Sequence, residues 1–186
     1  MTAADALPLF ADGPVDRVGI GATEAVGFGL LLAGEGPFLD EELSALAEQA
    51  RRSLRSERGM VNLLSPDLQM SFDAAGGAAS ISPRSLSMCH RSLPDVDDTG
   101  VLVVEDAALD RRFTDLPWVD GRWATIRFYA MARIGTPGGG GTVGSLCCFG
   151  DAPRSTTPAE RASLRHLADE AAGLLDRRRT ALLPEG

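Results

Sequence analysis

The chain has 186 residues, a length that suits one domain with flanking segments and is too short for two domains of ordinary size. Its net charge of -8 argues against binding to a nucleic-acid backbone, which needs a surplus of basic side chains. The three cysteines are odd in number and two of them are adjacent, which is not a disulfide framework and favours a reducing cytoplasm. The use of Arg without Lys is typical of a GC-rich genome.

Residues 1–37 are predicted to be an N-terminal extension. The first ten residues contain Asp5 and no basic side chain, unlike the start of a secretory signal peptide. The stretch 18–33 is fairly apolar, but it contains Glu24 and is shorter than the about 20 apolar residues that a membrane span needs. We therefore expect a cytoplasmic protein that does not contact a membrane.

A helix is predicted to begin at Asp40, where an acidic N-cap precedes apolar residues at helical spacing. It is expected to end near Gly59, because glycine commonly terminates helices. Two strand-like runs follow, at 60–64 and 68–72, and a Ser-Pro-Asp break between them predicts a hairpin.

The small, Gly-rich stretch 74–82 is predicted to be a loop, and 85–93 a short helix. The continuous apolar run 101–104 indicates a buried strand. Residues 126–134 alternate with a period of two, which is typical of a strand with two distinct faces. This strand is expected to form an antiparallel hairpin with 142–149.

The last predicted helix begins with a capping box, Thr157 and Glu160, followed by an apolar stripe at helical spacing. The arginines at 177–179 are expected to form a solvated helix end, and 180–186 a C-terminal tail. Together the elements predict an α/β (α+β) fold, with a mostly antiparallel central sheet and flanking N- and C-terminal helices.

Several blocks resemble those of bacterial GAF domains in both order and spacing. The blocks are PRSLSMC at 83–89, VVEDA at 103–107, LDRRF at 109–113, IRFYA at 126–130 and GSLCC at 144–148. Residues 38–179 are therefore identified as a GAF-like domain. The resemblance implies a sheet with helices on one side and a ligand pocket on the other, and a sensory role in signal transduction.

The same resemblance implies a small-molecule ligand and a homodimer formed through the flanking helices. Because only one helix and a short tail follow residue 150, the signal is expected to pass to a separate partner protein. We predict no catalytic residues and no bilin, haem or metal cofactor. The dipeptide Cys89-His90 precedes the strand at 101–104, whereas the bilin attachment site of GAF domains lies just before the strand that corresponds to 126–134.

The pocket candidates combine aromatic side chains with a few polar groups, the usual composition of a ligand site. Four of them alternate along the strand at 126–134, and Met131 and Arg133 stand where the family has Gly and Pro, so we expect a bulkier and more charged rim. The aromatic residues could instead cap the core, and Asp106 could be an ordinary loop residue. The candidates are Cys89, Asp106, Phe113, Trp118, Trp123, Arg127, Tyr129, Met131 and Arg133.

Two alternatives remain open. In the first, the chain is a cysteine-dependent redox enzyme of the free methionine sulfoxide reductase type, which requires a second cysteine within disulfide reach of Cys89. Cys147 and Cys148 are adjacent on a predicted strand and point to opposite faces, so only one of them could serve. In the second, the chain is a degenerate GAF scaffold or dimerisation module whose pocket is filled by side chains.

Overall fold

The computed structural model describes residues 40–136 and 141–182, so the extension predicted over 1–37 lies outside the described residues. Six strands form one sheet. They are β1 (Arg58–Leu64), β2 (Leu68–Asp73), β3 (Ser80–Pro83), β4 (Val101–Val104), β5 (Phe128–Gly135) and β6 (Thr142–Gly150). Their order is β3-β2-β1-β6-β5-β4 and every neighbouring pair is antiparallel, which confirms the predicted sheet.

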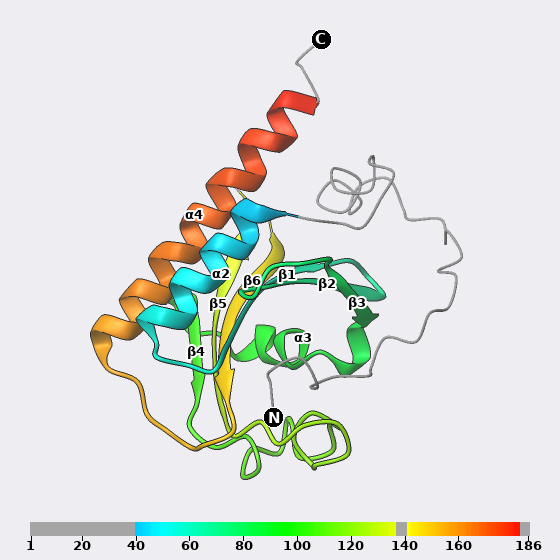
Figure 1. Cartoon of the computed structure of the whole chain (residues 1–186), viewed down its shortest axis with the longest axis vertical. Coiled ribbons are helices and arrows are strands. Elements are labelled where there is room, and N and C mark those ends of the chain that lie inside the picture. Colours follow the sequence, from blue (N-terminus) through cyan, green and yellow to red (C-terminus); the bar gives the residue numbers. More distant parts are fainter. Residues whose placement is uncertain (1–39, 137–140, 183–186) are drawn as a thin grey trace.

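Two helices, α2 (Glu41–Ser53) and α4 (Pro158–Leu182), lie side by side on one face of the sheet (Figure 1). The opposite face carries the short helix α3 (Met88–Ser92) and the loops between β4 and β5. This arrangement confirms the predicted α+β fold with flanking N- and C-terminal helices. Within the described parts of the chain, no helix has both the length and the apolar character that crossing a membrane requires.

The start of α2 was predicted correctly, but its end was not. The Asp40 side chain accepts a hydrogen bond of 3.0 Å from the Leu43 amide, as an N-cap does. The helix ends at Ser53, before the left-handed residue Arg55. Gly59 lies in β1, where an added Cβ would stand 2.4 Å from the Ala47 carbonyl oxygen. This glycine therefore allows α2 to pack closely on the sheet and does not terminate the helix.

Two other predictions need correction. The stretch 74–82 is not wholly a loop, because Ser80–Pro83 forms β3 and pairs with β2. The helix predicted over 85–93 is divided into the 3-10 turn Arg84–Leu86, α3 and the 3-10 turn Leu93–Asp95. Ser87 caps α3 and Pro94 lies in the last turn, so local side chains divide this segment.

Alternation along the strands separates two apolar clusters, one on each face of the sheet. On β5, Phe128 and Ala130 pack toward α2 and α4, whereas Tyr129 and Met131 pack toward α3. On β6, Cys148 packs with the helices and Cys147 faces α3. The two adjacent cysteines therefore lie on opposite faces, as strand geometry predicts.

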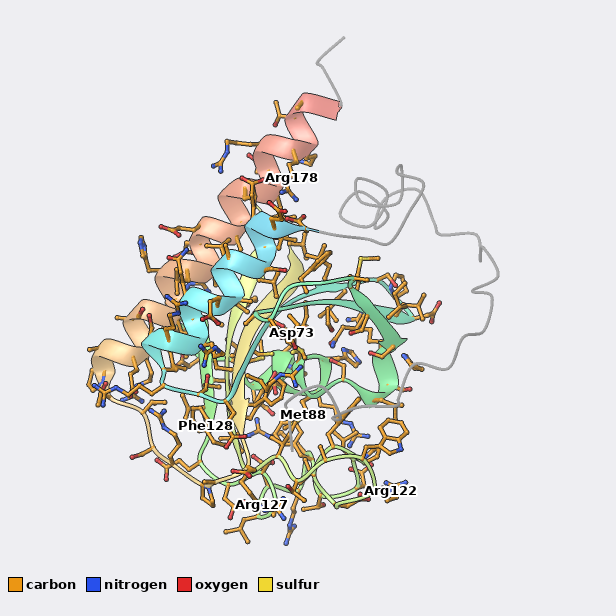
Figure 2. All side chains as sticks on the ribbon, in the orientation of Figure 1. Asp73, Met88, Arg122, Arg127, Phe128 and Arg178 are labelled. Atoms are coloured by element: carbon orange, nitrogen blue, oxygen red, sulfur yellow. The ribbon has the colours of Figure 1, made fainter. Side chains whose placement is uncertain are left out.

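The C-terminal helix begins with the predicted capping box. The Glu160 carboxylate accepts from the Thr157 amide at 2.7 Å, and the Glu160 amide donates to the Thr157 hydroxyl at 3.2 Å. The predicted solvated end is wrong for Arg178, which forms ion pairs with Asp40 and Glu42 near the start of α2 (Figure 2). The helix also continues through Leu182, past the domain boundary predicted at residue 179.

Candidate ligand-binding site

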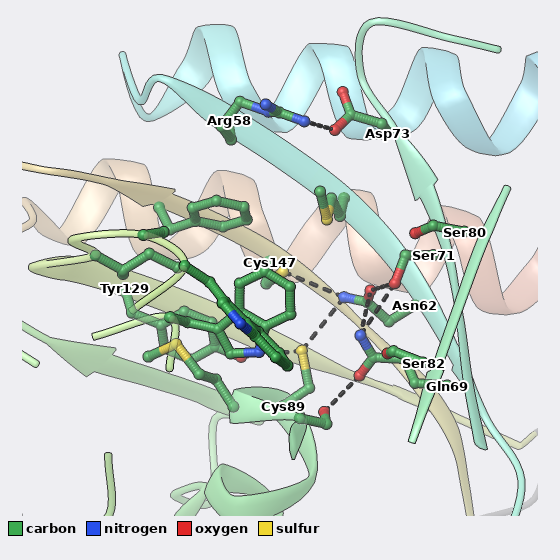
Figure 3. Close-up of a pocket in the computed structure, with 18 of the residues that line it drawn as sticks. Arg58, Asn62, Gln69, Ser71, Asp73, Ser80, Ser82, Cys89, Tyr129 and Cys147 are labelled. Atoms are coloured by element: carbon green, nitrogen blue, oxygen red, sulfur yellow. Dashed lines mark hydrogen bonds and ion pairs between the residues drawn. The ribbon is translucent and has the colours of Figure 1, made fainter. Parts of the chain in front are cut away.

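A cavity of about 570 Å³ lies on the α3 side of the sheet (Figure 3). Its floor is formed by strands β1, β2, β3 and β6, and its wall by α3 and the loop before β5. The volume falls in the usual range for small-molecule sites. Its lining includes Asn62, Gln69, Ser71, Ser82, Cys89, Trp118, Trp123, Tyr129 and Cys147.

The floor carries a hydrogen-bonded network of polar side chains. Asn62 and Ser71 are opposite each other on β1 and β2, and the Ser71 hydroxyl donates to Asn62 Oδ1 at 2.6 Å. The Gln69 amide donates to the same Oδ1 at 3.1 Å and to Ser71 Oγ at 3.0 Å. Ser87 of the α3 N-cap donates to Gln69 Oε1. The network fixes the orientation of the Asn62 amide and joins α3 to the sheet.

Two thiols meet at the inner end of this network. Asn62 Nδ2 donates to Cys89 Sγ and to Cys147 Sγ, each at 3.2 Å. The Tyr129 hydroxyl also donates to Cys89 Sγ, at 3.0 Å. All four side chains are nearly inaccessible to solvent, so these sulfur contacts lie in a medium of low dielectric constant, where such interactions are strengthened.

The two thiols have different acidities. Hydrogen bonding from Cys147, with smaller contributions from Ser145 and Tyr129, lowers the pKa of Cys89 to about 7 although burial acts in the opposite direction. The same thiol–thiol contact, together with burial, raises the pKa of Cys147. Burial also raises the pKa of Tyr129, so its hydroxyl remains a donor. These shifts favour a thiolate at Cys89 and a protonated thiol at Cys147.

An aromatic wall faces the polar floor. The rings of Trp118 and Trp123 meet edge to face with centroids 5.0 Å apart. The Trp118 indole donates to the Leu86 carbonyl at 3.0 Å, which fixes this ring next to α3. Trp123 remains 39% exposed and stands at the opening of the cavity. Of the two large apolar side chains that are exposed in the described residues, Leu109 and Trp123, only Trp123 belongs to the cavity lining, so its ring is accessible to a ligand.

The charged side chains of the described lining come from the end of the cavity where β1 begins and β2 and β6 end. Arg58 pairs with Asp73 across the two strands. Nearby, a hydrogen bond between the Glu57 and Asp151 carboxyl groups raises the pKa of Glu57. The charged rim that was expected around Met131 and Arg133 is therefore built from different residues, at the other end of the cavity.

Four of the nine predicted site residues line the cavity: Cys89, Trp118, Trp123 and Tyr129. Asp106 instead accepts a hydrogen bond from the Ala108 amide and closes a loop turn after β4. Phe113 is buried behind the cavity, with its ring 5.9 Å from that of Tyr129.

Arg127 and Arg133 lie outside the cavity lining. Arg127 donates to the carbonyls of Val119 and Ile126 in the loops at the end of the sheet (Figure 2). Arg133 is exposed toward the far end of β5. Met131 is fully buried beneath the lining. The strand alternates as predicted, but the cavity is open only beside its first residues.

The polar floor was not among the predicted site residues. Asn62, Gln69 and Ser71 lie on strands that were treated only as a hairpin, and Ser82 lies on a strand that was treated as a loop. A signal was present, because polar residues at 69, 71 and 73 alternate with apolar residues at 68, 70 and 72. Such alternation predicts that one face of β2 is polar, and that face proves to be the cavity floor.

The cysteines and histidines do not form a metal centre. All three cysteines are free thiols, and within residues 40–136 and 141–182 no group of three potential metal ligands comes together. His90 lies outside the cavity lining, where its Nδ1 accepts from Arg84 Nε at 2.9 Å. Burial and the neighbouring arginines lower the pKa of His90, which favours this neutral, accepting form.

The family model of the GAF domain matches residues 38–175 of this chain. The chain belongs to the GAF domain family. A curated relative, a cyclic di-GMP phosphodiesterase from Pseudomonas aeruginosa, is 34% identical over 142 residues. That match covers 75% of this chain but 22% of the relative, so the chain spans about a fifth of the relative's length.

Solved structures of GAF-type domains share the fold at low sequence identity. A chromophore-binding domain of a bacteriophytochrome from R. palustris has a TM-score of 0.58 at 14% identity, over 85% of this chain and 60% of that chain. A methyl-accepting chemotaxis protein has a TM-score of 0.55 at 16% identity, over 86% and 99%. The third GAF domain of Slr1393 from Synechocystis has a TM-score of 0.52 at 20% identity, over 77% and 98%. These similarities establish the GAF fold of the chain.

Proposed function

We propose that this GAF protein binds a small molecule in the cavity beside α3 and acts as a cytoplasmic sensor in signal transduction. The observation that carries the proposal is the cavity itself, about 570 Å³ that side chains leave open above a polar floor. A degenerate scaffold would instead fill this space with side chains. Binding, and not turnover, is the activity that this wall and floor support.

The lining favours a ligand with a flat apolar part and an uncharged buried end. Trp118 and Trp123 offer aromatic surface on the wall, which suits stacking or edge contacts with a planar group. The side chains of Asn62, Gln69 and Ser71 offer neutral hydrogen-bonding groups on the floor. Among the described lining residues Arg58 is the one cation, and it is paired with Asp73 and accompanied by two further carboxyl groups, so a deeply buried anion is disfavoured.

A thermal-shift screen with nucleotides, cyclic nucleotides, amino acids, haem and bilins tests the proposal. A ligand that binds only the folded state at a hundredfold excess over Kd adds about 2.7 kcal/mol of stability. For a domain of this size we expect Tm to rise by about 5–10 °C.

Two matched substitutions locate the binding. Ser82→Trp places an indole in the cavity and is expected to abolish the ligand-induced shift. Ser85→Trp adds the same indole at an exposed residue outside the lining and should leave the shift intact. A ligand whose shift survives Ser82→Trp binds elsewhere, and that result would contradict the proposed site.

We further propose that the protein acts through a separate signalling partner and as a homodimer. The proposal is supported by the length of α4, whose last turn continues past the start of α2 and has no contact with the described part of that helix beyond Arg178 (Figure 1). Light scattering on the purified protein reports the oligomeric state directly. A monomer at micromolar concentration would contradict the dimer.

A second candidate is the cysteine-dependent reduction of free methionine sulfoxide, and one observation favours it. Cys89 and Cys147 both accept a hydrogen bond from the Asn62 side-chain amide, so Cys147 lies close enough to be the second thiol that such a reductase needs. The assay is incubation with free methionine sulfoxide and an excess of a dithiol reductant. Since we propose a binding protein, we expect no methionine beyond that formed without the protein. Multiple turnovers that disappear in Cys147→Ala would establish the reductase instead.

A further inference from the structure

We propose that Cys89 and Cys147 are a reversible dithiol–disulfide pair that responds to hydroperoxides entering the cavity. The inference does not depend on which ligand the cavity binds. It concerns a reaction of the protein's own side chains, and each cysteine is converted once per oxidation event.

The geometry brings together two residues that are far apart in the sequence. Cys89 is held on α3 and Cys147 on β6, yet each sulfur lies 3.2 Å from the same Asn62 nitrogen (Figure 3). Both residues belong to the cavity lining, so a small oxidant reaches them although they are shielded from bulk solvent. Because both sulfurs contact the same nitrogen, they lie no more than twice 3.2 Å apart, and a disulfide forms when the two side chains bring them to about 2.0 Å.

Hydrogen-bond donors converge on one of the two sulfurs. Cys89 Sγ accepts from Asn62 Nδ2 at 3.2 Å and from the Tyr129 hydroxyl at 3.0 Å. Such an arrangement stabilises a thiolate at Cys89, and the thiolate is the nucleophilic form of cysteine. Cys147 keeps its proton and serves as the second, resolving thiol. A buried pair that had only to fill space would not need two hydrogen-bond donors directed at one sulfur.

The hydroperoxide is the only reactant in this oxidation that the protein does not itself supply. The Cys89 thiolate attacks the peroxide, one oxygen is transferred to sulfur as a sulfenic acid, and the O–O bond breaks as the other oxygen leaves as hydroxide or alkoxide. Cys147 then attacks the sulfenic sulfur, the S–S bond forms, and the hydroxyl group leaves as water after taking up the Cys147 proton. Two thiols and one hydrogen peroxide thus give one disulfide and two water molecules, and a dithiol reductant reverses the change.

The third cysteine provides an internal control. Cys148 is adjacent to Cys147 but faces α2 and α4, in the apolar cluster on the other side of the sheet. Burial raises its pKa to about 12. Cys148 is outside the cavity lining and should remain a thiol under conditions that oxidise the other two.

Mass spectrometry of the wild-type protein tests the pair. The reduced protein is treated with hydrogen peroxide in modest excess, denatured with an alkylating reagent, and digested. We expect one alkylated cysteine, at Cys148, and a peptide pair linked through Cys89 and Cys147, with all three cysteines alkylated again after dithiothreitol treatment. Three alkylated cysteines after oxidation, or a link between Cys147 and Cys148, would overturn the proposal.

Three alanine variants give a matched series. Cys148→Ala should form the disulfide as the wild type does. Cys147→Ala lacks the resolving thiol, so Cys89 should gain one or two oxygen atoms without forming a link. Cys89→Ala should leave Cys147 unmodified. A Cys147 that is oxidised as fast in Cys89→Ala as in the wild type would contradict the assignment of Cys89 as the nucleophile.

The pH dependence of the oxidation rate separates this role from simple proximity. The rate should rise through a midpoint near pH 7, because the thiolate of Cys89 is the reacting form. Tyr129→Phe removes one donor and is expected to move the midpoint upward by about one pH unit. If the rate of the wild-type protein instead has its midpoint near the pKa of an ordinary cysteine, Cys89 is not the stabilised thiolate proposed here. Ligand binding and disulfide formation are measured in separate experiments, so a negative result for one does not decide the other.

Discussion

Replacing Gly144 with alanine is expected to destabilise the protein by about 3 kcal/mol, at the upper end of the usual cost of overpacking. An added Cβ would stand 2.0 Å from the Asn62 carbonyl oxygen and 3.3 Å from Leu63 Cα. Both are backbone atoms of β1, which is paired with β6 at the centre of the sheet, so neither can move aside easily. Thermal unfolding should show a fall in Tm of about 6–12 °C.

Gly150 on the same strand is the matched control. An alanine Cβ there would meet only the Glu57 side chain, at 3.6 Å or more, which is an ordinary contact with a flexible group. Gly150→Ala is therefore expected to change the free energy of unfolding by about 0.5 kcal/mol or less. If both variants lose the same free energy of unfolding, the close approach of β1 and β6 at Gly144 is not the cause of the destabilisation.

Removing the Asp40 carboxylate is expected to cost about 2–3 kcal/mol of folding free energy. This side chain is nearly buried, caps α2 through the Leu43 amide, and pairs with Arg178 of α4. Asp40→Ala loses the cap and the ion pair together. Asp40→Asn keeps an oxygen for the cap and loses only the charge, so about half of the effect should remain.

Urea-induced unfolding of the two Asp40 variants and of Arg178→Ala measures these contributions. The double variant Asp40→Ala/Arg178→Ala should be less destabilised than the sum of its single variants, because the pair is already broken by either change. Strict additivity would contradict a direct interaction between the two helices at this point.

Local patterns in the sequence were sufficient for most of the fold. The alternation at 126–134 gave both the strand and its two faces, and the structure places Phe128 toward the helices and Tyr129 toward the cavity. The capping box at Thr157 gave the start of α4. These signals depend on residues a few positions apart, so no knowledge of the tertiary structure was needed to interpret them.

Contacts between distant segments could not be predicted in the same way. Gly59 suggested a helix end, but its role is to let α2 approach the sheet, which depends on residues of two elements. The proximity of Cys89 and Cys147 depends on how α3 is placed over β6, and the sequence offered Cys148 as an equal partner until the faces of the strand were known. The candidate site was therefore only partly predicted. Its floor lies on strands whose alternating polar residues were not interpreted as the lining of a cavity.

The central claim is that the cavity beside α3 binds a small molecule, and calorimetric titration with a ligand from the screen tests it most directly. We predict saturable binding of one ligand per chain to the wild type and to Ser85→Trp, and no measurable heat of binding to Ser82→Trp, with all three proteins folded by circular dichroism. Ser82 lies on the cavity lining and Ser85 does not, so only the first substitution fills the proposed site. Undiminished binding to Ser82→Trp would contradict the account.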